Sequence, residues 1–308
     1  MVALAAPVAP ATAREAMSFE AAMRRYIQAH HVTWSNAKHA RQWETSLRNH
    51  AAPLMRQNVA QITSADIEAV MLPIWLSKIE TASRVRQRIE RVLSASIARG
   101  DRPGPNPAAW RDNLEHILPA QSKVRKVKHH AAVPWEDAPA AFRTIWDMRG
   151  TGTGYQALVT LILTGMRSGE VRSLEWEDIK RDHLLIPAER MKARKAQRFG
   201  MSLPLAIWLD SLPRIEGTDC VHPGRFNRLM SDETIATAMQ GAGLGEYTVH
   251  GWRSTFSDWA NAQGWSRDLI EDALAHQIGN STERAYRRGD YLDRRQKLMA
   301  AWARYLLS

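Results

Sequence analysis

A break in apolar periodicity near the middle of the chain is the feature that most constrains its fold. Residues 119–134 show no apolar period and carry a run of Lys, Arg and His side chains. On either side, apolar residues recur at spacings of three and four, which is typical of helices that bury one face. The 308 residues suffice for two separate cores. We therefore predict a disordered, Ala- and Pro-rich lead-in over 1–17, a helical domain over 18–118, a basic linker over 119–134 and a second domain over 135–308.

The first domain is predicted to consist of helices that carry basic side chains beside their apolar stripes. Ser18 and Ser64 are expected helix caps, and a later helix spans about 82–99. On that later helix Arg84, Arg88 and Arg91 follow at i, i+4 and i+7, so they share one face. A solvated helix face would explain such a run as well, but further cations stand on an earlier helix and in the linker. We expect the following side chains to contact DNA: Lys38, Arg41, Arg84, Arg88, Arg91 and Lys126.

Charge and cysteine content narrow the class of partner. The net charge is +10, which favours a polyanionic partner. Residues 1–130 hold 19 Lys and Arg against 10 Asp and Glu, whereas residues 131–308 hold 23 against 22, so the first part should dominate non-specific attraction to phosphate. The single cysteine, Cys220, excludes an intrachain disulfide and favours a reducing, intracellular setting. No apolar run approaches the roughly 20 residues of a membrane span, so we expect no membrane partner.

The second domain is predicted to be mainly α-helical with a small antiparallel sheet. An apolar helix over 155–163 should end at Thr164-Gly165, and Ser168 can cap a short helix after it. The period then changes, and strands are predicted at 183–186, 190–193 and 199–203. Further helices are expected to start at Ser231, Thr248 and Ser266. The last helix is expected over 292–306.

A set of residues in the second domain carries groups suited to phosphate chemistry. In chain order they are Arg167, Lys192, His250, Arg253, His276 and Tyr286. His250 and Arg253 stand at i and i+3 near an expected helix start, so they should share one face. No carboxylate cluster accompanies the set, and we expect neither a metal site nor a cofactor. Each residue alone has a structural explanation, and only their order and spacing together indicate a site.

These side chains fit metal-free phosphoryl transfer through tyrosine. Arginine binds two phosphate oxygens at once, and a helix N-terminus adds backbone N–H groups that face an anion. Histidine moves protons near neutral pH. The phenol of tyrosine ionises only near pH ~10, but a cationic pocket favours the phenolate and so activates it as a nucleophile. We therefore predict that a tyrosine attacks a phosphate and forms a covalent phosphotyrosine.

Longer stretches of the sequence resemble a known family. They are LILTGMRSGEVRSLEWEDI, IPAERMK, TVHGWRSTFSDWA and LAHQIGNSTERAYRRGDYLDRRQKLMAAWARYL in the second domain, with HHVTWSNAKHARQWETSL and ETASRVRQRIERVL in the first. From about residue 18 onward the chain resembles the tyrosine recombinases, and most of all the integrases of P4-like prophages and genomic islands. The resemblance implies a helical core-binding domain, a mixed α/β catalytic domain, and site-specific recombination that integrates or excises mobile DNA.

The resemblance also implies how the cationic residues and the tyrosine share the reaction. Tyr286 would attack the scissile phosphate and leave a 3′-phosphotyrosine and a free 5′-hydroxyl. Arg167 and Arg253 would hold the non-bridging oxygens, and Lys192 would protonate the departing 5′-oxygen. Because the covalent bond retains the phosphodiester energy, a second 5′-hydroxyl can reverse the attack without ATP.

The histidines and one carboxylate have supporting roles in the same resemblance. His250 would assist proton transfer at the tyrosine, and His276 would hydrogen-bond the phosphate, a position that some relatives fill with Trp. Glu170 would be a structural partner that holds the arginine turn.

Two of these assignments have rivals within the chain. Tyr291 lies five residues after Tyr286, so on a continuous helix it would point ~140° away and could not take the same pose. Tyr305 stands among apolar residues of the last helix and is predicted to pack there. Lys195 is the alternative to Lys192, because the segment after Lys192 lacks the histidine often found there in relatives.

The resemblance carries expectations about assembly as well. Relatives usually begin with an arm-site-binding domain, whereas only about 17 residues precede the matching region here, so the chain is either trimmed or works without arm sites. The partners implied are double-stranded DNA attachment sites, further copies in a homotetramer on DNA, and an accessory DNA-bending or directionality factor. The terminal helix could pack on its own domain or on a neighbouring protomer. We expect a monomer in solution and a bacterial, cytoplasmic protein associated with the nucleoid.

Three other functions are alternatives to recombination. A type IB topoisomerase would nick and reseal DNA without strand exchange, but the match in the first domain favours recombination. A non-catalytic DNA-binding regulator would be expected to lack one of the six residues. A metal-dependent nuclease would need carboxylates such as Glu170, Glu175, Glu177 and Asp178, which are better explained as exposed or ion-paired residues.

Overall fold

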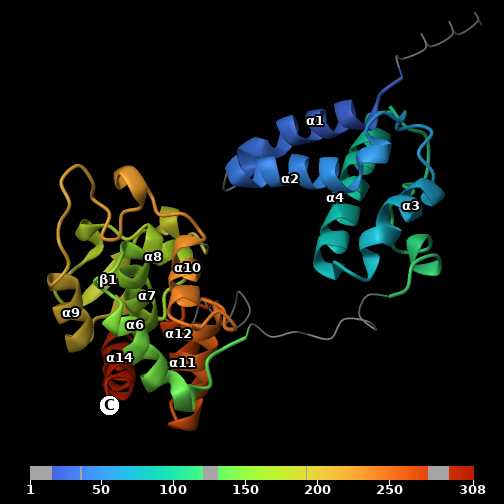
Figure 1. The fold of residues 1–308 in the computed structure, drawn as a ribbon. Helices are drawn as coiled ribbons and strands as arrows, with labels where there is room; N and C mark the ends of the chain where they lie inside the picture. Colours follow the sequence, from blue (N-terminus) through green and yellow to red (C-terminus); the bar gives the residue numbers. More distant parts are fainter. Residues whose placement is uncertain (1–15, 35–36, 121–130, 192, 277–290) are drawn as a thin grey trace, which may run out of the picture. The chain divides into compact units, whose positions relative to one another are not determined.

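The computed structural model describes residues 16–34, 37–120, 131–191, 193–276 and 291–308, with the side chains of the helix that begins at Ala37 described from His39 onward. The chain divides into two compact units, Met1–Val127 and Lys128–Ser308, which we call unit 1 and unit 2. Each has its own hydrophobic core (Figure 1). Within the described ranges, no helix is long and apolar enough to cross a membrane.

In unit 1 the apolar stripes of the described helices meet on one long helix. The helices are α1 (Phe19–His30), α2 (Ala37–His50), α3 (Ser64–Trp75) and α4 (Ile79–Ala98). Short 3-10 turns follow α1 at His31–Thr33, α2 at Ala52–Leu54 and α4 at Leu114–His116. α4 packs against the other three. Its buried residues Val85, Ile89 and Val92 repeat at three and four, as the periodicity predicted.

Local hydrogen bonds explain where two helices of unit 1 begin. The hydroxyl of Ser18 accepts from the backbone N–H of Ala21 at 3.2 Å, which confirms the predicted cap of α1. α3 is capped one residue earlier than predicted, by Thr63 instead of Ser64. Thr63 Oγ1 accepts from the N–H of Asp66 at 3.2 Å, and the Asp66 carboxylate accepts from the N–H of Thr63 at 2.8 Å. This reciprocal capping box needs a carboxylate three residues after the cap, which only Thr63 has.

Unit 2 surrounds a buried central helix with further helices and a small sheet (Figure 1). Its helices are α6 (Ala138–Asp147), α7 (Thr153–Thr164), α8 (Ser168–Arg172), α9 (Leu203–Asp210), α10 (Thr234–Gly241), α11 (Gly251–Ala262), α12 (Arg267–Ala273) and α14 (Leu292–Leu306). Short 3-10 helices lie at Trp135–Asp137, Trp176–Asp178, Ala188–Arg190 and Arg225–Asn227. β1 (His183–Ile186) and β2 (Gln197–Gly200) pair antiparallel with His183 opposite Gly200. The described residues are therefore mainly α-helical with one small antiparallel sheet, as predicted.

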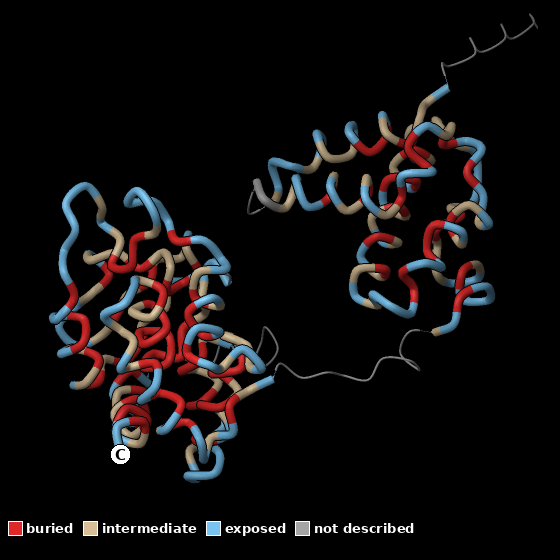
Figure 2. Tube along the Cα trace, viewed as in Figure 1, coloured by how far each residue is buried: buried red, intermediate tan, exposed pale blue. Residues whose placement is uncertain are grey.

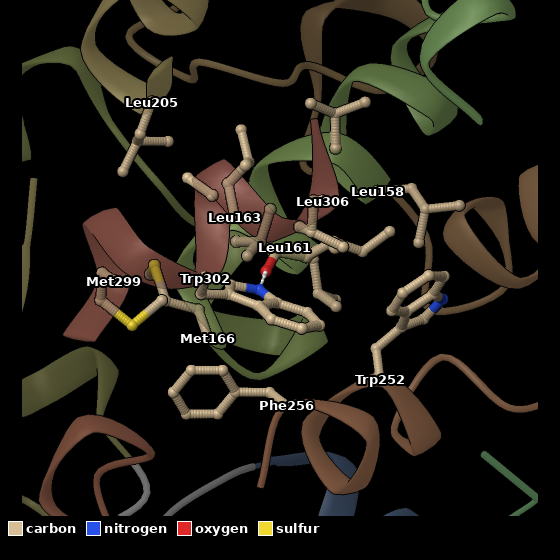
Figure 3. Packing of buried hydrophobic residues seen from close by; sticks show 14 of the residues in the cluster. Leu158, Leu161, Leu163, Met166, Leu205, Trp252, Phe256, Met299, Trp302 and Leu306 are labelled. Atoms are coloured by element: carbon tan, nitrogen blue, oxygen red, sulfur yellow. Dashed lines mark hydrogen bonds between the residues drawn. The ribbon is translucent and has the colours of Figure 1, made fainter. Parts of the chain in front are cut away.

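The terminal helix α14 closes the core of its own unit. Its residues Leu298, Met299 and Trp302 are buried and belong to the same core as residues of α7 and α11. Buried residues are red in Figure 2, and Figure 3 shows Trp302 near Leu161 and Phe256. Trp302 Nε1 donates to the carbonyl of Ile162 on α7 at 2.8 Å (Figure 3). The apolar face of α14 is therefore covered within the same chain.

The region between the predicted strands departs from the expectation. Strand 183–186 is confirmed, but Ala188–Arg190 forms a 3-10 turn, and no described residue of 190–193 is in a strand. The Arg190 guanidinium forms an ion pair with Asp178 at 2.5 Å, a tertiary contact that holds this segment in the turn. The predicted strand 199–203 ends at Gly200, because Ser202 caps α9 and accepts from the N–H of Leu205 at 3.3 Å.

A histidine lies fully buried in the core of unit 2. His222 is 0% exposed, and its Nε2 lies 2.9 Å from Thr160 Oγ1. The same hydroxyl donates to the carbonyl of Gln156 and accepts from Trp208 Nε1 at 2.9 Å, so it has room to accept from His222 Nε2–H. Burial lowers the pKa of His222 from 6.5 to about 3, so the ring is neutral in the fold.

We expect this histidine to make unit 2 acid-sensitive. The unfolded chain binds a proton at His222 below pH 6.5 and the folded chain only near pH 3, so stability falls as pH drops through that window. Each pH unit within it costs about 1.4 kcal/mol at 25 °C. Urea unfolding of the full chain at about pH 7.5 and pH 4.5 should therefore show a loss about 2–3 kcal/mol larger for the wild type than for His222→Gln. Equal pH dependence in the two proteins would contradict this origin of acid sensitivity.

Candidate active site

The turn between α7 and α8 positions the first arginine of the set. α7 ends at Gly165, whose φ of 66° is left-handed, and the chain then enters α8 with Arg167 in the N-cap position. The Glu170 carboxylate, which is buried, accepts from the backbone N–H and from the guanidinium of Arg167, each at 2.8 Å. Glu170 thus holds the arginine turn, and this pair begins α8 in place of the predicted cap Ser168.

The second arginine is buried inside unit 2 and binds backbone carbonyls. Arg253 lies in the first turn of α11 and is only 3% exposed. Its guanidinium donates to the carbonyls of Gly165 and Leu274, and to His276 Nε2 at 2.9 Å. Among the described residues Arg253 has no carboxylate partner, and its Nε has no hydrogen-bond partner. The positive charge is therefore held in place by dipoles without being neutralised.

The surroundings of Arg253 reduce its basicity but leave it charged. Burial, and to a smaller extent the nearby Arg167 guanidinium, lower the pKa of Arg253 from 12.5 to about 10. The carboxylates of Glu170 and Glu271 act in the opposite direction. At neutral pH two guanidinium groups consequently stand close together, one of them buried. Such an arrangement favours the binding of an anion that can accept hydrogen bonds from both.

The turn after α12 brings three backbone and side-chain groups to these arginines. Ala275 has a left-handed φ of 50°, an unusual conformation for a residue other than glycine. In this turn the carbonyl of Leu274 accepts from Arg253, and that of Ala275 accepts from Arg167 at 3.0 Å. The next residue, His276, contacts Arg253 with Nε2. The α7–α8 turn, the start of α11 and the end of α12 thus converge on one cationic site.

The structure brings together Arg167, Arg253 and His276 from the predicted set. His250 is the N-cap residue of α11, so it lies at the same end of this helix as Arg253. Its side chain is exposed, whereas that of Arg253 is buried. Four predicted residues lie outside what is described: Lys126, Lys192, Tyr286 and the side chain of Lys38. Lys195, the alternative to Lys192, is exposed in the connection between β1 and β2.

The rival tyrosine of the last helix is accounted for by packing. Tyr305 donates to the carbonyl of Trp135 at 2.8 Å and stacks on Trp259 with ring centroids 5.6 Å apart. Burial raises the pKa of its phenol, and the charges of Glu136 and Asp137 act in the same direction. Tyr305 therefore lacks the cationic environment that would activate a nucleophile.

Three of the four carboxylates considered for a metal-dependent nuclease form a group of their own, whereas the fourth, Glu170, pairs with Arg167. Glu175, Glu177 and Asp178 stand close enough together to offer three ligand atoms to a metal ion. Arg190, however, pairs with Asp178 at 2.5 Å and with Glu175 at 3.4 Å, and Asp178 also accepts from the N–H of Glu175 at 2.9 Å. A cation already neutralises this group, in agreement with the ion-paired role predicted for it.

The basic residues predicted for unit 1 gather between α2 and α4. A groove of about 570 Å³ is lined by Arg41, Arg84 and Arg88, and a neighbouring groove of about 230 Å³ by Arg84, Arg88 and Arg91. Arg41, Arg84 and Arg91 are exposed, whereas Arg88 turns inward. The Arg88 guanidinium donates to the carbonyl of Gln42 and to Ser46, and it lies 5.4 Å from the centroid of the Trp43 ring.

Sequence reasoning missed the groups that surround the arginines. Glu271, whose carboxylate lies 2.6 Å from His276 Nδ1, was not singled out. The carbonyls of Gly165, Leu274 and Ala275 could not be found either, because backbone groups leave no mark on residue type. The signal available was the five-residue spacing between Glu271 and His276 across the end of a helix.

Comparison with known proteins assigns both units to one family. Residues 150–292 match the phage integrase family, and residues 19–113 match the phage integrase central domain. Prophage integrase IntZ of Escherichia coli (strain K12) is 30% identical over 277 residues, which cover 88% of this chain and 66% of IntZ. The integrase of Enterobacteria phage P4 is 27% identical over 251 residues, covering 74% of this chain and 55% of that integrase. The chain thus spans slightly less than two thirds of IntZ and just over half of the P4 integrase.

A solved structure has the same fold. A lambda integrase (75-356) dimer bound to a COC' core site superposes with a TM-score of 0.68 at 15% identity, covering 85% of this chain and 96% of that chain. The two units therefore have the fold of that integrase. This chain belongs to the phage integrase family, as its sequence motifs predicted.

Proposed function

We propose that this chain is a site-specific DNA recombinase that cuts and rejoins DNA through a 3′-phosphotyrosine, and so integrates or excises mobile DNA. The observation that supports it most is the buried Arg253, which lies beside Arg167 and His276 and has no paired carboxylate among the described residues. A buried, uncompensated cation is costly, and a bound phosphate would offset that cost. Membership of the phage integrase family supplies the reaction class.

In this proposal the arginines hold the phosphate while the tyrosine replaces one of its ester oxygens. Arg167 and Arg253 donate to the two non-bridging oxygens and stabilise the charge that grows on them in the transition state. His250 accepts the phenol proton as Tyr286 Oη bonds to phosphorus. The bond from phosphorus to the 5′-oxygen breaks, and Lys192 gives that oxygen a proton.

Rejoining is the same reaction in reverse. The 5′-hydroxyl of a second strand attacks the phosphotyrosine, a new phosphodiester forms, and Tyr286 recovers its proton. The number of phosphoester bonds is unchanged, so the exchange requires neither ATP nor a redox partner. The two arginines provide the charge stabilisation that metal ions provide in other phosphoryl transfers, so we expect no metal requirement.

Unit 1 would hold the DNA through its basic grooves. Arg41, Arg84 and Arg91 are exposed on one surface of α2 and α4 and can reach backbone phosphates. Lys38 and Lys126 are proposed to extend this contact. Arg88 already donates from Nη1 to the carbonyl of Gln42 and to Ser46, so it would join them through its other N–H groups.

The proposed setting is a bacterial nucleoid in the cytoplasm, where the substrate is a pair of double-stranded attachment sites. Two duplexes and four strand cleavages require four protomers, and we propose a homotetramer on DNA and a monomer in solution. Because the apolar face of α14 is covered within its own unit, contacts between protomers would have to use other surfaces. An accessory DNA-bending or directionality factor is part of the proposal.

Capture of the covalent intermediate tests the proposed function. Duplexes tiled across the ends of the DNA element that carries the gene are nicked next to the candidate cleavage site, so that the released fragment diffuses away and religation stops. We expect one duplex to form an SDS-stable protein–DNA adduct in the presence of EDTA. Failure of every duplex to do so would overturn the proposal.

Adduct capture, together with plasmid relaxation and strand-exchange assays, separates the alternative functions. A metal-dependent nuclease would release free fragments and would stop in EDTA. A type IB topoisomerase would relax supercoiled plasmid lacking any attachment site, whereas a recombinase should exchange strands only between paired sites. A non-catalytic regulator would bind the duplex and leave it intact.

A further inference from the structure

The imidazole of His276 is held at both of its nitrogens. Nδ1 lies 2.6 Å from Glu271 Oε2, and Nε2 lies 2.9 Å from a guanidinium nitrogen of Arg253. A guanidinium can only donate, so Nε2 must accept, and the ring proton must lie on Nδ1. Glu271 accepts that proton's hydrogen bond. The arrangement therefore selects the neutral Nδ1–H tautomer of His276.

The end of α12 fixes this pair locally. The backbone N–H of His276 donates to the carbonyl of Glu271 at 2.9 Å, and that of Ala275 donates to the carbonyl of Asp272 at 3.0 Å. With Ala275 in the left-handed region, these two bonds are those of a Schellman motif. The motif places the side chains of its first and last residues together, usually as an apolar contact. Here Glu271 and His276 occupy those positions, so a carboxylate–imidazole pair replaces the apolar one.

This state of His276 is unsuited to binding a phosphate. A neutral ring with its lone pair on Nε2 presents an acceptor, and phosphate oxygens are acceptors too. Nε2 can donate to a phosphate only if the ring takes up a second proton or changes tautomer. A tautomer change would break the 2.6 Å contact with Glu271, whereas protonation would strengthen it.

We propose that Glu271 is a positioning residue that makes His276 a proton-linked switch. The identity of the phosphate as a DNA phosphate rests on the proposed function. Without DNA, Glu271 holds His276 as an acceptor for Arg253. When a DNA phosphate accepts the hydrogen bond that Arg253 gives to His276, Nε2 of His276 binds a proton from solvent. The new Nε2–H then donates a hydrogen bond to a phosphate oxygen. The Nδ1–H group stays hydrogen-bonded to Glu271, whose carboxylate balances the positive charge of the imidazolium. Binding thus takes up one proton and breaks no covalent bond.

The charged groups around His276 favour this order of events. Arg253 on α11 and Arg167 in the α7–α8 turn oppose a third positive charge while the site is empty. Glu170 is committed to Arg167, and Asp272 on α12 pairs with Arg295 of α14 at 3.2 Å. Among the described residues, Glu271 is therefore the carboxylate that contacts the ring, and the phosphate supplies the further negative charge that protonation requires.

The tautomer can be tested without DNA. In protein labelled with ¹⁵N-histidine, two-bond ¹H–¹⁵N correlations distinguish the tautomers, and a His276→Gln variant identifies the signals of His276. We expect the Nδ1–H form in the wild type and a shift towards Nε2–H in Glu271→Leu. Asp258→Asn, an exposed carboxylate on α11, is the control and should leave the signals unchanged. An Nε2–H tautomer in the wild type would overturn the inference.

Proton uptake on DNA binding tests the switch itself. Calorimetric titration of the adduct-forming duplex, un-nicked, into the full chain at about pH 7.5, in two buffers of different ionisation enthalpy, counts the protons bound. We expect about one proton per protomer for the wild type and for Asp258→Asn, and close to none for Glu271→Gln, which retains an acceptor but loses the charge. Equal uptake in Glu271→Gln and wild type would refute the role of Glu271.

The two arms separate this inference from the proposed function. If no duplex forms an adduct, the proposed function fails, while the tautomer experiment still decides whether Glu271 sets the state of His276. If an adduct forms but binding takes up no proton in the wild type, the switch is wrong and the recombinase assignment stands.

Discussion

Replacing Tyr286 by phenylalanine is expected to abolish the SDS-stable adduct while DNA binding persists. The phenolic oxygen is the atom that would bond to phosphorus, and phenylalanine has no nucleophilic atom in its place. The loss should exceed about 10⁴-fold in the rate of adduct formation, because covalent catalysis is removed outright. A band-shift assay with the un-nicked duplex should give an affinity within about twofold of wild type, since one hydroxyl adds little to a contact dominated by charge.

Tyr291→Phe provides the matched control for this variant. Tyr291 is 39% exposed and stands at the N-cap position of α14, with the Arg294 guanidinium 5.4 Å from its ring. Phenylalanine retains the ring and this contact, and removes only the hydroxyl. The control should form the adduct at the wild-type rate. An adduct in Tyr286→Phe that disappears in Tyr291→Phe would move the nucleophile to Tyr291.

Elements with a strong apolar period were predictable from the sequence with accurate bounds. The strand at 183–186 and the last helix at 292–306 agree residue for residue with β1 and α14. In α14 the burial pattern follows the residue type directly, whereas in β1 Leu184 is buried and the equally apolar Leu185 is only half-buried. Local periodicity is sufficient where one face alone is buried.

Predictions failed where a contact from elsewhere in the chain decides the local structure. A strand is predicted at 190–193, yet Arg190 pairs with Asp178 and Ala188–Arg190 forms a 3-10 turn. The segment 199–203 contains its own warning, because Ser202 followed by Pro204 is typical of a helix start. The first error needs the tertiary structure to correct it, and the second could have been avoided.

In the candidate site, too, residue types were predictable from the sequence and tertiary contacts were not. Residue types and spacing were enough to select Arg167, Arg253 and His276, which the structure places in contact through a few hydrogen bonds. The sequence could not indicate that Arg253 would be buried, or that carbonyls at the ends of α7 and α12 would hold it. Those features depend on how three helix ends meet, and they determine how strongly the site attracts an anion.

Replacing the buried Arg253 by methionine is expected to lower the rate of adduct formation strongly while changing the free energy of unfolding little. Lowering the pKa of Arg253 from 12.5 to about 10 corresponds to roughly 3 kcal/mol spent on keeping the charge in the fold. Methionine removes that cost and fills similar space, but it leaves the carbonyls of Gly165 and Leu274 without these donors, at about 1–3 kcal/mol each. The terms oppose each other, so the free energy of unfolding should change by no more than about 3 kcal/mol.

Adduct formation should respond very differently from stability. Loss of one preorganised donor to a transition-state oxygen costs about 10²–10³-fold, and Arg253→Met removes a charge together with its donors, so we expect a loss of at least about 10³-fold. Arg253→Lys keeps the charge, but its ammonium has only three N–H donors and cannot hold both carbonyls while donating twice to a phosphate, so it should recover only part of the rate. Urea unfolding and single-turnover adduct formation on the same preparations measure both quantities. A Met variant that unfolds far more easily and loses activity in proportion would mean that Arg253 serves the fold first, and one with wild-type cleavage would remove it from the site.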